Sequence, residues 1–160
     1  MKTTRTRTSK IQQELRQRRP FRSQRQEAGV ALLRTADVVK RRMARVIEPA
    51  GITLQQYNVL RILRGAGEGG IATLEIARRM IEQTPGITRL LDRLESKRLV
   101  RRERCPSDRR QVLCWITTEG QELLVGLDEP VNRADVEVLR ALGGEELQRL
   151  IELLDSIRGE

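Results

Sequence analysis

The sequence contains no histidine, and only one Phe, one Tyr and one Trp among its 160 residues. The absence of histidine excludes Ser-His-Asp and Cys-His nucleophiles, the usual imidazole acid or base, and His-ligated zinc or haem. The scarcity of aromatic side chains argues against an aromatic-rich β-barrel and against an RNA platform that stacks bases. We therefore expect an aliphatic core and a protein that is not an enzyme.

Cysteine and long apolar runs are equally sparse. Two cysteines cannot make a four-ligand zinc site, so no metal or other cofactor is expected. No stretch approaches the roughly 20 apolar residues of a membrane span, and residues 1–23 lack the apolar run of a signal peptide. We expect no membrane partner and a reducing, cytoplasmic location.

Positive charge is in excess, and it is unevenly distributed. The chain has 31 Lys and Arg against 22 Asp and Glu, a net charge of +9. Residues 1–25 carry nine of the basic residues and one acid, whereas residues 111–160 carry four arginines and eleven acids. A merely solvated basic surface does not predict this segregation. It favours a nucleic-acid partner over an anionic membrane, because no leucine-rich or aromatic face accompanies the N-terminal charges.

Residues 1–22 are predicted to be a basic, disordered arm. A short helix from Lys10 to Arg19, capped by Ser9, is compatible with the sequence before Pro20. Two interpretations of the arm remain open, a flexible tail and a segment that touches DNA phosphates.

A long amphipathic helix is predicted from Ser23 to Glu48, where apolar residues recur every three or four positions until Pro49 and Gly51. Such a helix would be about 38 Å long at 1.5 Å per residue, too long for one small domain to cover. We therefore expect it to pack against a second copy of the chain.

The middle of the chain has the pattern of a winged helix. Thr53 and Gln56 form a capping box for one helix, and a second, short helix begins near Thr73. The next helix is expected to start with Thr84 as N-cap and Pro85 at its first position, and to have a polar, basic N-terminal half. The strands expected at Leu99–Arg104 and Val112–Thr117 then form a hairpin with a basic tip.

Helical patterns return in the last third. One helix is expected from Thr117 or Thr118 to Leu142, kinked or restarted at Pro130, and a second follows Gly143-Gly144. We predict four regions: the arm at residues 1–22, an N-terminal dimerisation helix at 23–52, a winged helix-turn-helix at 53–117, and C-terminal helices that complete the dimer at 118–160.

Four short blocks carry a resemblance to the MarR family of bacterial winged-helix transcriptional regulators. They are residues 84–95 (TPGITRLLDRLE), 99–102 (LVRR), 107–110 (SDRR) and 116–120 (ITTEG). Their order and spacing make the resemblance specific. It implies a mainly α (α+β) fold with a winged helix-turn-helix between N- and C-terminal dimerisation helices. One departure is Arg98, since the family commonly has glycine at this left-handed cap.

The resemblance also implies a function. A MarR-type homodimer would bind a pseudo-palindromic site in double-stranded DNA, repress transcription, and be released by a small-molecule effector whose pocket lies near Ala36, Lys40 and Tyr57. The expected DNA-binding residues are Thr84, Gly86, Thr88, Arg89, Arg93, Asp108, Arg109 and Arg110.

Each of these residues has an expected task. The N-terminal half of the recognition helix would meet base edges or nearby phosphates, with Arg89 able to bind guanine through two hydrogen bonds and Arg93 contacting a phosphate. The resemblance implies that Asp108 orients Arg110 in the minor groove while Arg109 reaches the backbone. Alternatively, Asp108 only caps its own turn.

Cys105 and Cys114 should be several residues out of register in the hairpin and unable to form a disulfide.

The alternative to a transcriptional regulator is a sequence-tolerant architectural DNA-binding protein whose basic arm and hairpin coat the duplex.

Overall fold

The computed structural model describes residues 9–83, 85–108 and 110–159, which fall into two units. The first unit ends at Arg41 and contains α1 (Lys10–Glu14) and most of α2 (Gln24–Ile47). The predicted helix at Lys10 is thus shorter than expected, because Arg16 adopts a left-handed conformation with φ of 51°. The long predicted helix is confirmed as α2.

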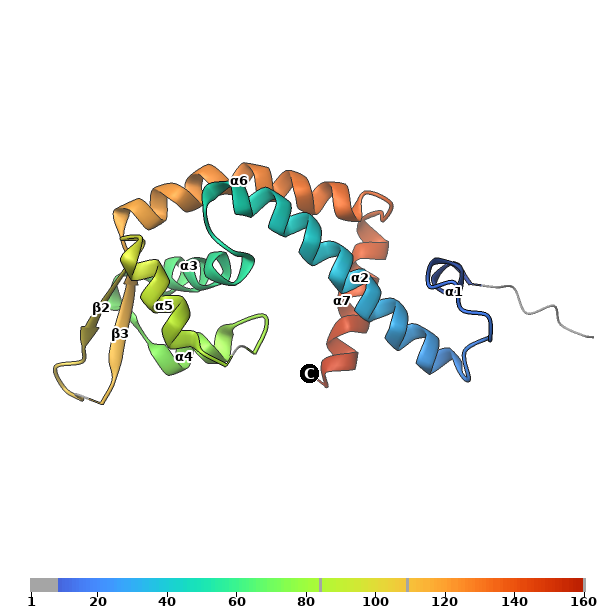
Figure 1. Cartoon of the computed structure of the whole chain (residues 1–160), viewed down its shortest axis with the longest axis horizontal. Coiled ribbons are helices and arrows are strands. Elements are labelled where there is room, and N and C mark those ends of the chain that lie inside the picture. Colours follow the sequence, from blue (N-terminus) through green and yellow to red (C-terminus); the bar gives the residue numbers. More distant parts are fainter. Residues whose placement is uncertain (1–8, 84, 109, 160) are drawn as a thin grey trace, which may run out of the picture. The chain divides into compact units, whose positions relative to one another are not determined.

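The second unit runs from Arg42 and holds the remaining elements (Figure 1). In chain order they are η1 (Glu48–Ala50), α3 (Leu54–Ala66), η2 (Gly67–Gly69), β1 (Ile71–Ala72), α4 (Thr73–Arg79), α5 (Ile87–Ser96), β2 (Val100–Arg104), β3 (Val112–Ile116), α6 (Thr118–Leu139) and α7 (Gly144–Arg158). The expected mainly helical fold with a small sheet is confirmed. Pro130 lies inside α6, which continues through it as one helix.

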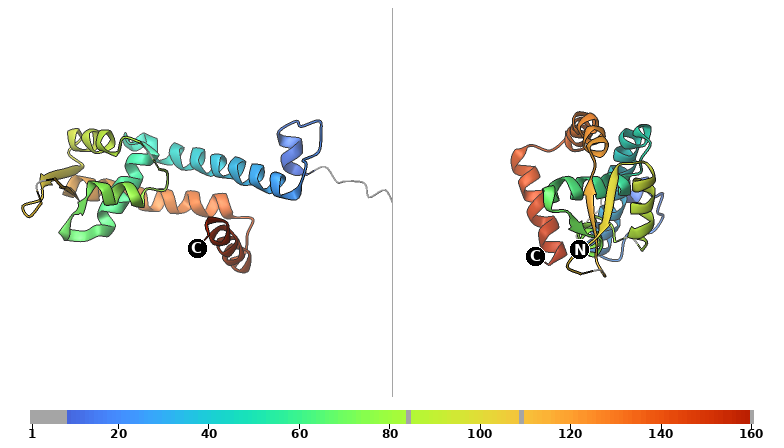
Figure 2. Two further views of the ribbon diagram at one scale, coloured as in Figure 1. Left: turned by 90° about the horizontal axis from the view of Figure 1, so that it is seen from below. Right: turned by 90° about the vertical axis from the view of Figure 1, so that its left-hand side faces the viewer.

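The sheet is antiparallel with strand order β1-β3-β2. Strands β2 and β3 pair from Val100 opposite Ile116 to Arg104 opposite Val112, and their hairpin projects beyond the helices of this unit (Figure 2). The two-residue strand β1, absent from the sequence prediction, adds Ile71 opposite Cys114.

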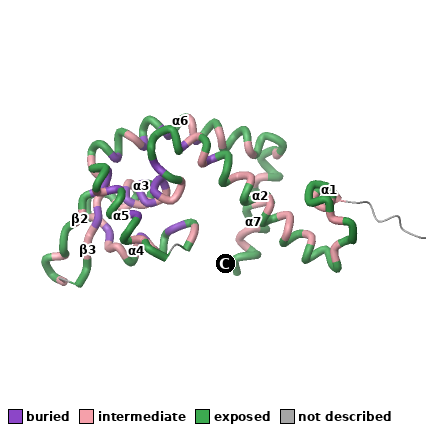
Figure 3. Tube along the Cα trace, viewed as in Figure 1, coloured by how far each residue is buried: buried purple, intermediate pink, exposed green. Residues whose placement is uncertain are grey.

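The core of the second unit is aliphatic, as expected. Its fully buried side chains come from the end of α2 and from α3, α4, α5, α6 and β3, and include Ile47, Leu60, Leu63, Ile76, Leu91, Leu94, Cys114 and Leu124. The capping box of α3 is present, with Gln56 Oε1 accepting from the Thr53 N–H at 3.0 Å. In contrast, α7 has no buried residue (Figure 3).

The joint between the hairpin and α6 depends on the absence of a side chain at Gly120. A Cβ atom there would lie 2.4 Å from the Leu99 carbonyl oxygen and 2.8 Å from Ile116 Cγ1. We expect Gly120→Ala to lower the free energy of unfolding by about 1–3 kcal/mol, because the backbone of Leu99 must move. Gly126→Ala is the matched control in the same helix, since nothing lies within 4 Å of that Cβ position.

Urea unfolding of both variants at one protein concentration measures the difference. The control should gain about 0.5–1 kcal/mol from its better helix propensity. Equal stability of the two variants would contradict the close packing at Gly120.

No helix in the described part of the chain combines the length and the apolar character of a membrane-spanning segment.

Candidate nucleic-acid interface

Helix α5 presents one apolar and one polar face. Its buried residues are Leu90, Leu91 and Leu94, whereas Thr88, Arg89 and Arg93 are exposed. This alternation arises because residues three and four apart share one side of a helix. The structure therefore brings three of the expected DNA-binding residues together on the solvent side of one helix.

The start of α5 differs from the sequence prediction. The N-cap is Gly86 rather than Thr84, and Gly86 has φ of 107°, a conformation that L side chains rarely adopt. Its carbonyl oxygen accepts from the N–H groups of Arg89 at 2.9 Å and Leu90 at 3.3 Å. The first N–H groups of a helix have no intrahelical acceptor, so this end of α5 suits a phosphate oxygen. Thr84 lies outside the described residues.

The tip of the hairpin is held by Asp108. One carboxylate oxygen accepts from the backbone N–H of Arg110 at 3.0 Å, and the other accepts from Gln111 Nε2 at 2.9 Å. The Cys105 N–H closes the loop by donating to the Gln111 carbonyl oxygen at 2.9 Å. Asp108 thus reaches Arg110 through its backbone and not through its guanidinium, and the Arg110 side chain is exposed. Arg109 lies outside the described residues.

Arg102 connects the hairpin to α5, the helix that the sequence predicts to be the recognition helix. Its Nε donates to Glu95 Oε2 at 3.0 Å, and its Nη2 lies 2.7 Å from Asp92 Oδ1. The Glu95 hydrogen bond is the main cause that raises the pKa of Arg102 above its ordinary value. The contact fixes β2 against α5 and offsets part of the negative charge of these two carboxylates.

The exposed arginines of the α5 polar face and of the hairpin tip differ from several other arginines of the second unit in their lack of a carboxylate partner. Within the described chain, no carboxylate forms an ion pair with Arg89, Arg93 or Arg110. Several arginines away from this surface are paired, such as Arg64 with Asp128 at 2.9 Å and Arg79 with Glu75 at 2.8 Å. The polar face of α5 and the hairpin tip therefore carry positive charge available to an external anion.

A groove of about 620 Å³ runs between α4, α5 and the hairpin. Thr88 of α5 and Arg110 of the hairpin both line it, together with the exposed side chain of Leu74. Residues 22 positions apart in the chain thus share one surface. The sequence predicted both residues but not the groove, which Arg102 also lines while it binds Asp92 and Glu95 of α5.

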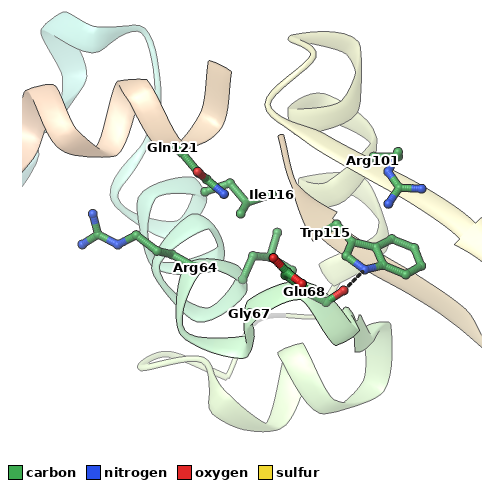
Figure 4. Close-up of a pocket in the computed structure, with 8 residues that line it drawn as sticks. Arg64, Gly67, Glu68, Arg101, Trp115, Ile116 and Gln121 are labelled. Carbon is green, nitrogen blue, oxygen red and sulfur yellow. Dashed lines mark hydrogen bonds between the residues drawn. The ribbon is translucent and has the colours of Figure 1, made fainter. Parts of the chain in front are cut away.

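A second cavity of about 320 Å³ lies at the base of the hairpin (Figure 4). The indole N–H of Trp115 donates to the Glu68 carbonyl oxygen at 3.0 Å, and the Arg101 guanidinium lies 4.4 Å from the ring centroid. The glycine-rich segment 65–70 therefore anchors the sheet through Glu68. Sequence reasoning missed this role because the contact spans 47 residues.

Both cysteines are free, in agreement with the predicted mismatch of register. Cys114 lies opposite Arg102 in the hairpin, and burial raises the pKa of its thiol. The hydrogen bond to Ser107 lowers the pKa of the Cys105 thiol. No group of three or more metal-ligating side chains occurs among the described residues.

The recognition helix, its supporting helices and the hairpin together define a winged helix-turn-helix protein. The profile of the MarR family matches residues 52–112. The transcriptional regulator HosA of Escherichia coli O111:H- is 31% identical over 103 residues, which span 64% of this chain and 75% of that protein. The chain belongs to the MarR family of transcriptional regulators, a family of regulators and not of enzymes.

Two solved structures illustrate the match. A MarR transcription factor from Planctomyces limnophilus is 41% identical with a TM-score of 0.66, covering 85% of this chain and 98% of that one. A mutant of MarR from E. coli, crystallised with operator DNA, is 28% identical with a TM-score of 0.73, covering 81% and 91% of the two chains.

Proposed function

We propose that this protein is a MarR-type repressor that binds a pseudo-palindromic operator as a homodimer and works in the cytoplasm. The observation that carries the proposal is the shared surface of α5 and the hairpin. On this surface, Arg89, Arg93 and Arg110 form no ion pair with any carboxylate of the described residues. Arg102 links the hairpin to α5 through Asp92 and Glu95. The operator-bound E. coli relative supports the same use of this fold.

The proposal assigns each residue a role. Thr88 and Arg89 meet base edges in the major groove, Gly86 allows a phosphate close to the helix end, and Arg93 binds a phosphate. Arg110 enters the minor groove, while Asp108 fixes the loop that carries it. Thr84 and Arg109, which the sequence also places on this surface, are assigned a base or phosphate contact and a backbone contact.

Dimerisation is proposed through α2 and the C-terminal helices, which corresponds to the predicted regions 23–52 and 118–160. At 1.5 Å per residue, the 24 residues of α2 extend about 36 Å. In α7, Ile151 is 53% exposed and Ile157 is 67% exposed. A second copy of the chain is the partner that covers such helices in a two-fold regulator.

Sedimentation equilibrium at micromolar concentration is expected to give twice the chain mass of 18.4 kDa. Ile151→Asp combined with Ile157→Asp should weaken dimerisation about 100-fold or more, because two buried isoleucines contribute about 3 kcal/mol or more. Ile81→Asp is the control, since Ile81 is 84% exposed on the loop before α5. A parent protein that stays monomeric at every concentration would refute the dimer.

The proposal that a small-molecule effector releases the protein from its operator is supported by membership of the MarR family alone. The residues expected near such a pocket, Ala36, Lys40 and Tyr57, remain a prediction. An effector should reduce operator affinity of the parent dimer without unfolding it.

The competing function is a sequence-tolerant architectural protein. A regulator should bind its operator at least about 10³ times more tightly than random duplex at one salt concentration, whereas an architectural protein should bind both alike. Fluorescence anisotropy with the two duplexes measures this ratio. Equal affinity would overturn the proposed function.

A further inference from the structure

The described start of the chain carries a second concentration of positive charge. We call its six exposed side chains, Lys10, Arg16, Arg18, Arg19, Arg22 and Arg25, the cationic patch. Glu14 is the only acid between residues 9 and 25. Within the described chain, no carboxylate forms an ion pair with any member of the patch.

Neutral side chains hold the backbone of this segment. Gln12 Nε2 donates to the Gln17 carbonyl oxygen at 3.3 Å, and Gln17 Nε2 donates to the Arg19 carbonyl oxygen at 2.9 Å. Gln26 Oε1 accepts from the Arg22 N–H at 2.8 Å. Because amide groups make these contacts, the guanidinium groups are not needed to fold the segment.

The acidic third of the chain shows the opposite arrangement. Its four arginines, Arg133, Arg140, Arg149 and Arg158, each form an ion pair three or four residues away. The cationic patch has no such internal neutralisation, and like charges at this density repel one another. A polyanion that supplies closely spaced phosphates relieves that repulsion and releases its own counterions.

Duplex DNA fits this patch better than a membrane does. An interfacial membrane segment needs a broad apolar face beside its charges. Between residues 9 and 25, Leu15 is the single large apolar side chain that is exposed, so the segment has no broad apolar face. The segment also belongs to the same chain as the winged helix, so a duplex long enough to reach both is bound as one tethered ligand.

We propose that the cationic patch binds backbone phosphates of the duplex flanking the operator, without regard to base sequence. The inference extends the proposed function by adding a second, sequence-independent contact surface. It predicts that affinity depends on duplex length beyond the operator. It also predicts that the patch contributes to salt dependence but not to base preference.

The test replaces Arg16, Arg18, Arg19 and Arg22 together by glutamine in the full-length chain. The probe is a random-sequence duplex of about 40 base pairs, with affinity measured by anisotropy across a series of salt concentrations. Each lost phosphate contact should reduce the slope of log K against log salt by about 0.9, hence about 3–4 for the four contacts of each subunit. Affinity near 0.1 M salt should fall about tenfold or more.

The matched control replaces the same four residues by lysine, which retains the charge. It should keep the parent slope within about one unit, because a phosphate responds to a point charge. A glutamine variant with the parent slope would overturn the proposal, and so would a lysine variant as weak as the glutamine one. Binding to anionic phospholipid vesicles that is lost in the glutamine variant, with unchanged duplex affinity, would assign the patch to a membrane and overturn it as well.

The outcome is separable from that of the proposed function. The glutamine variant should retain the parent's ratio of operator to random affinity. If the parent shows no such ratio, the regulator proposal fails, while the slope on random duplex still decides the role of the patch.

Discussion

Replacing Asp108 by alanine is expected to weaken operator binding about tenfold, although the change removes a negative charge from a DNA-facing loop. The Asp108 carboxylate accepts from the Arg110 N–H and from Gln111 Nε2, and without it the loop that carries Arg110 loses both restraints. Simple electrostatics predicts the opposite sign. The variant therefore separates a shaped wing from a basic surface.

Arg110→Ala should have a larger effect, about 150-fold to 10⁴-fold, since a lost charge-assisted contact costs about 1.5–3 kcal/mol and the dimer loses it twice. It should also exceed Arg109→Ala, because solvent and ions partly replace a contact to the DNA backbone. Asp108→Asn is the matched control. It removes the same charge but keeps an oxygen that can accept from the Arg110 N–H, so it should bind at least as tightly as the parent.

Fluorescence anisotropy with operator and random duplex at one salt concentration provides the measurement, after circular dichroism has confirmed that each variant folds. Tighter operator binding by Asp108→Ala than by the parent would show that Asp108 does not organise the wing.

The second large effect is expected at Arg89. Arg89→Ala should reduce the ratio of operator to random affinity between about 30-fold and 10⁴-fold, because a bidentate contact to guanine contributes about 1–3 kcal/mol and a dimer makes it twice. Arg93→Ala, on the same exposed face of α5, should weaken both duplexes alike, since a phosphate contact carries no base preference.

The two arginine variants are compared in one titration series. An unchanged ratio for Arg89→Ala would remove this residue from base readout. A ratio that falls equally in Arg93→Ala would indicate that the two side chains do not have the separate tasks proposed.

Elements with local signals were predictable from the sequence. The capping box of Thr53 and Gln56 depends on residues three positions apart, and the structure contains both of its hydrogen bonds. The long helix α2 follows from apolar periodicity and ends in the region of Pro49. The hairpin strands were placed to within one residue, because turn residues and alternation fix them.

Features that depend on distant contacts were not predictable. The N-cap of α5 moved from Thr84 to Gly86 because a left-handed residue turns the chain into the helix. Arg98 takes the left-handed conformation with φ of 59° that was expected to favour glycine. The Leu99 N–H still donates to the Leu94 carbonyl oxygen, and Thr117 Oγ1, 19 residues away, donates to the Arg98 carbonyl oxygen at 2.7 Å.

The candidate DNA-binding site likewise contains residues that were predictable from local sequence patterns and contacts that were not. Thr88, Arg89 and Arg93 could be assigned to one exposed face from helical periodicity alone. The link from Arg102 to Asp92 and Glu95 could not, because sequence shows charges but not which pairs meet across β2 and α5. The backbone hydrogen bond of Asp108 combines the two readings of that residue, since it caps the turn and in doing so positions Arg110.

Selection of binding sites from random duplex tests the central claim most directly. A two-fold dimer with one recognition helix per subunit should recover sites with two symmetry-related half-sites, their centres about one helical turn or a multiple of it apart. Two chains should bind each recovered duplex. Recovered sequences with no two-fold symmetry, or no enrichment over the starting pool, would contradict the account.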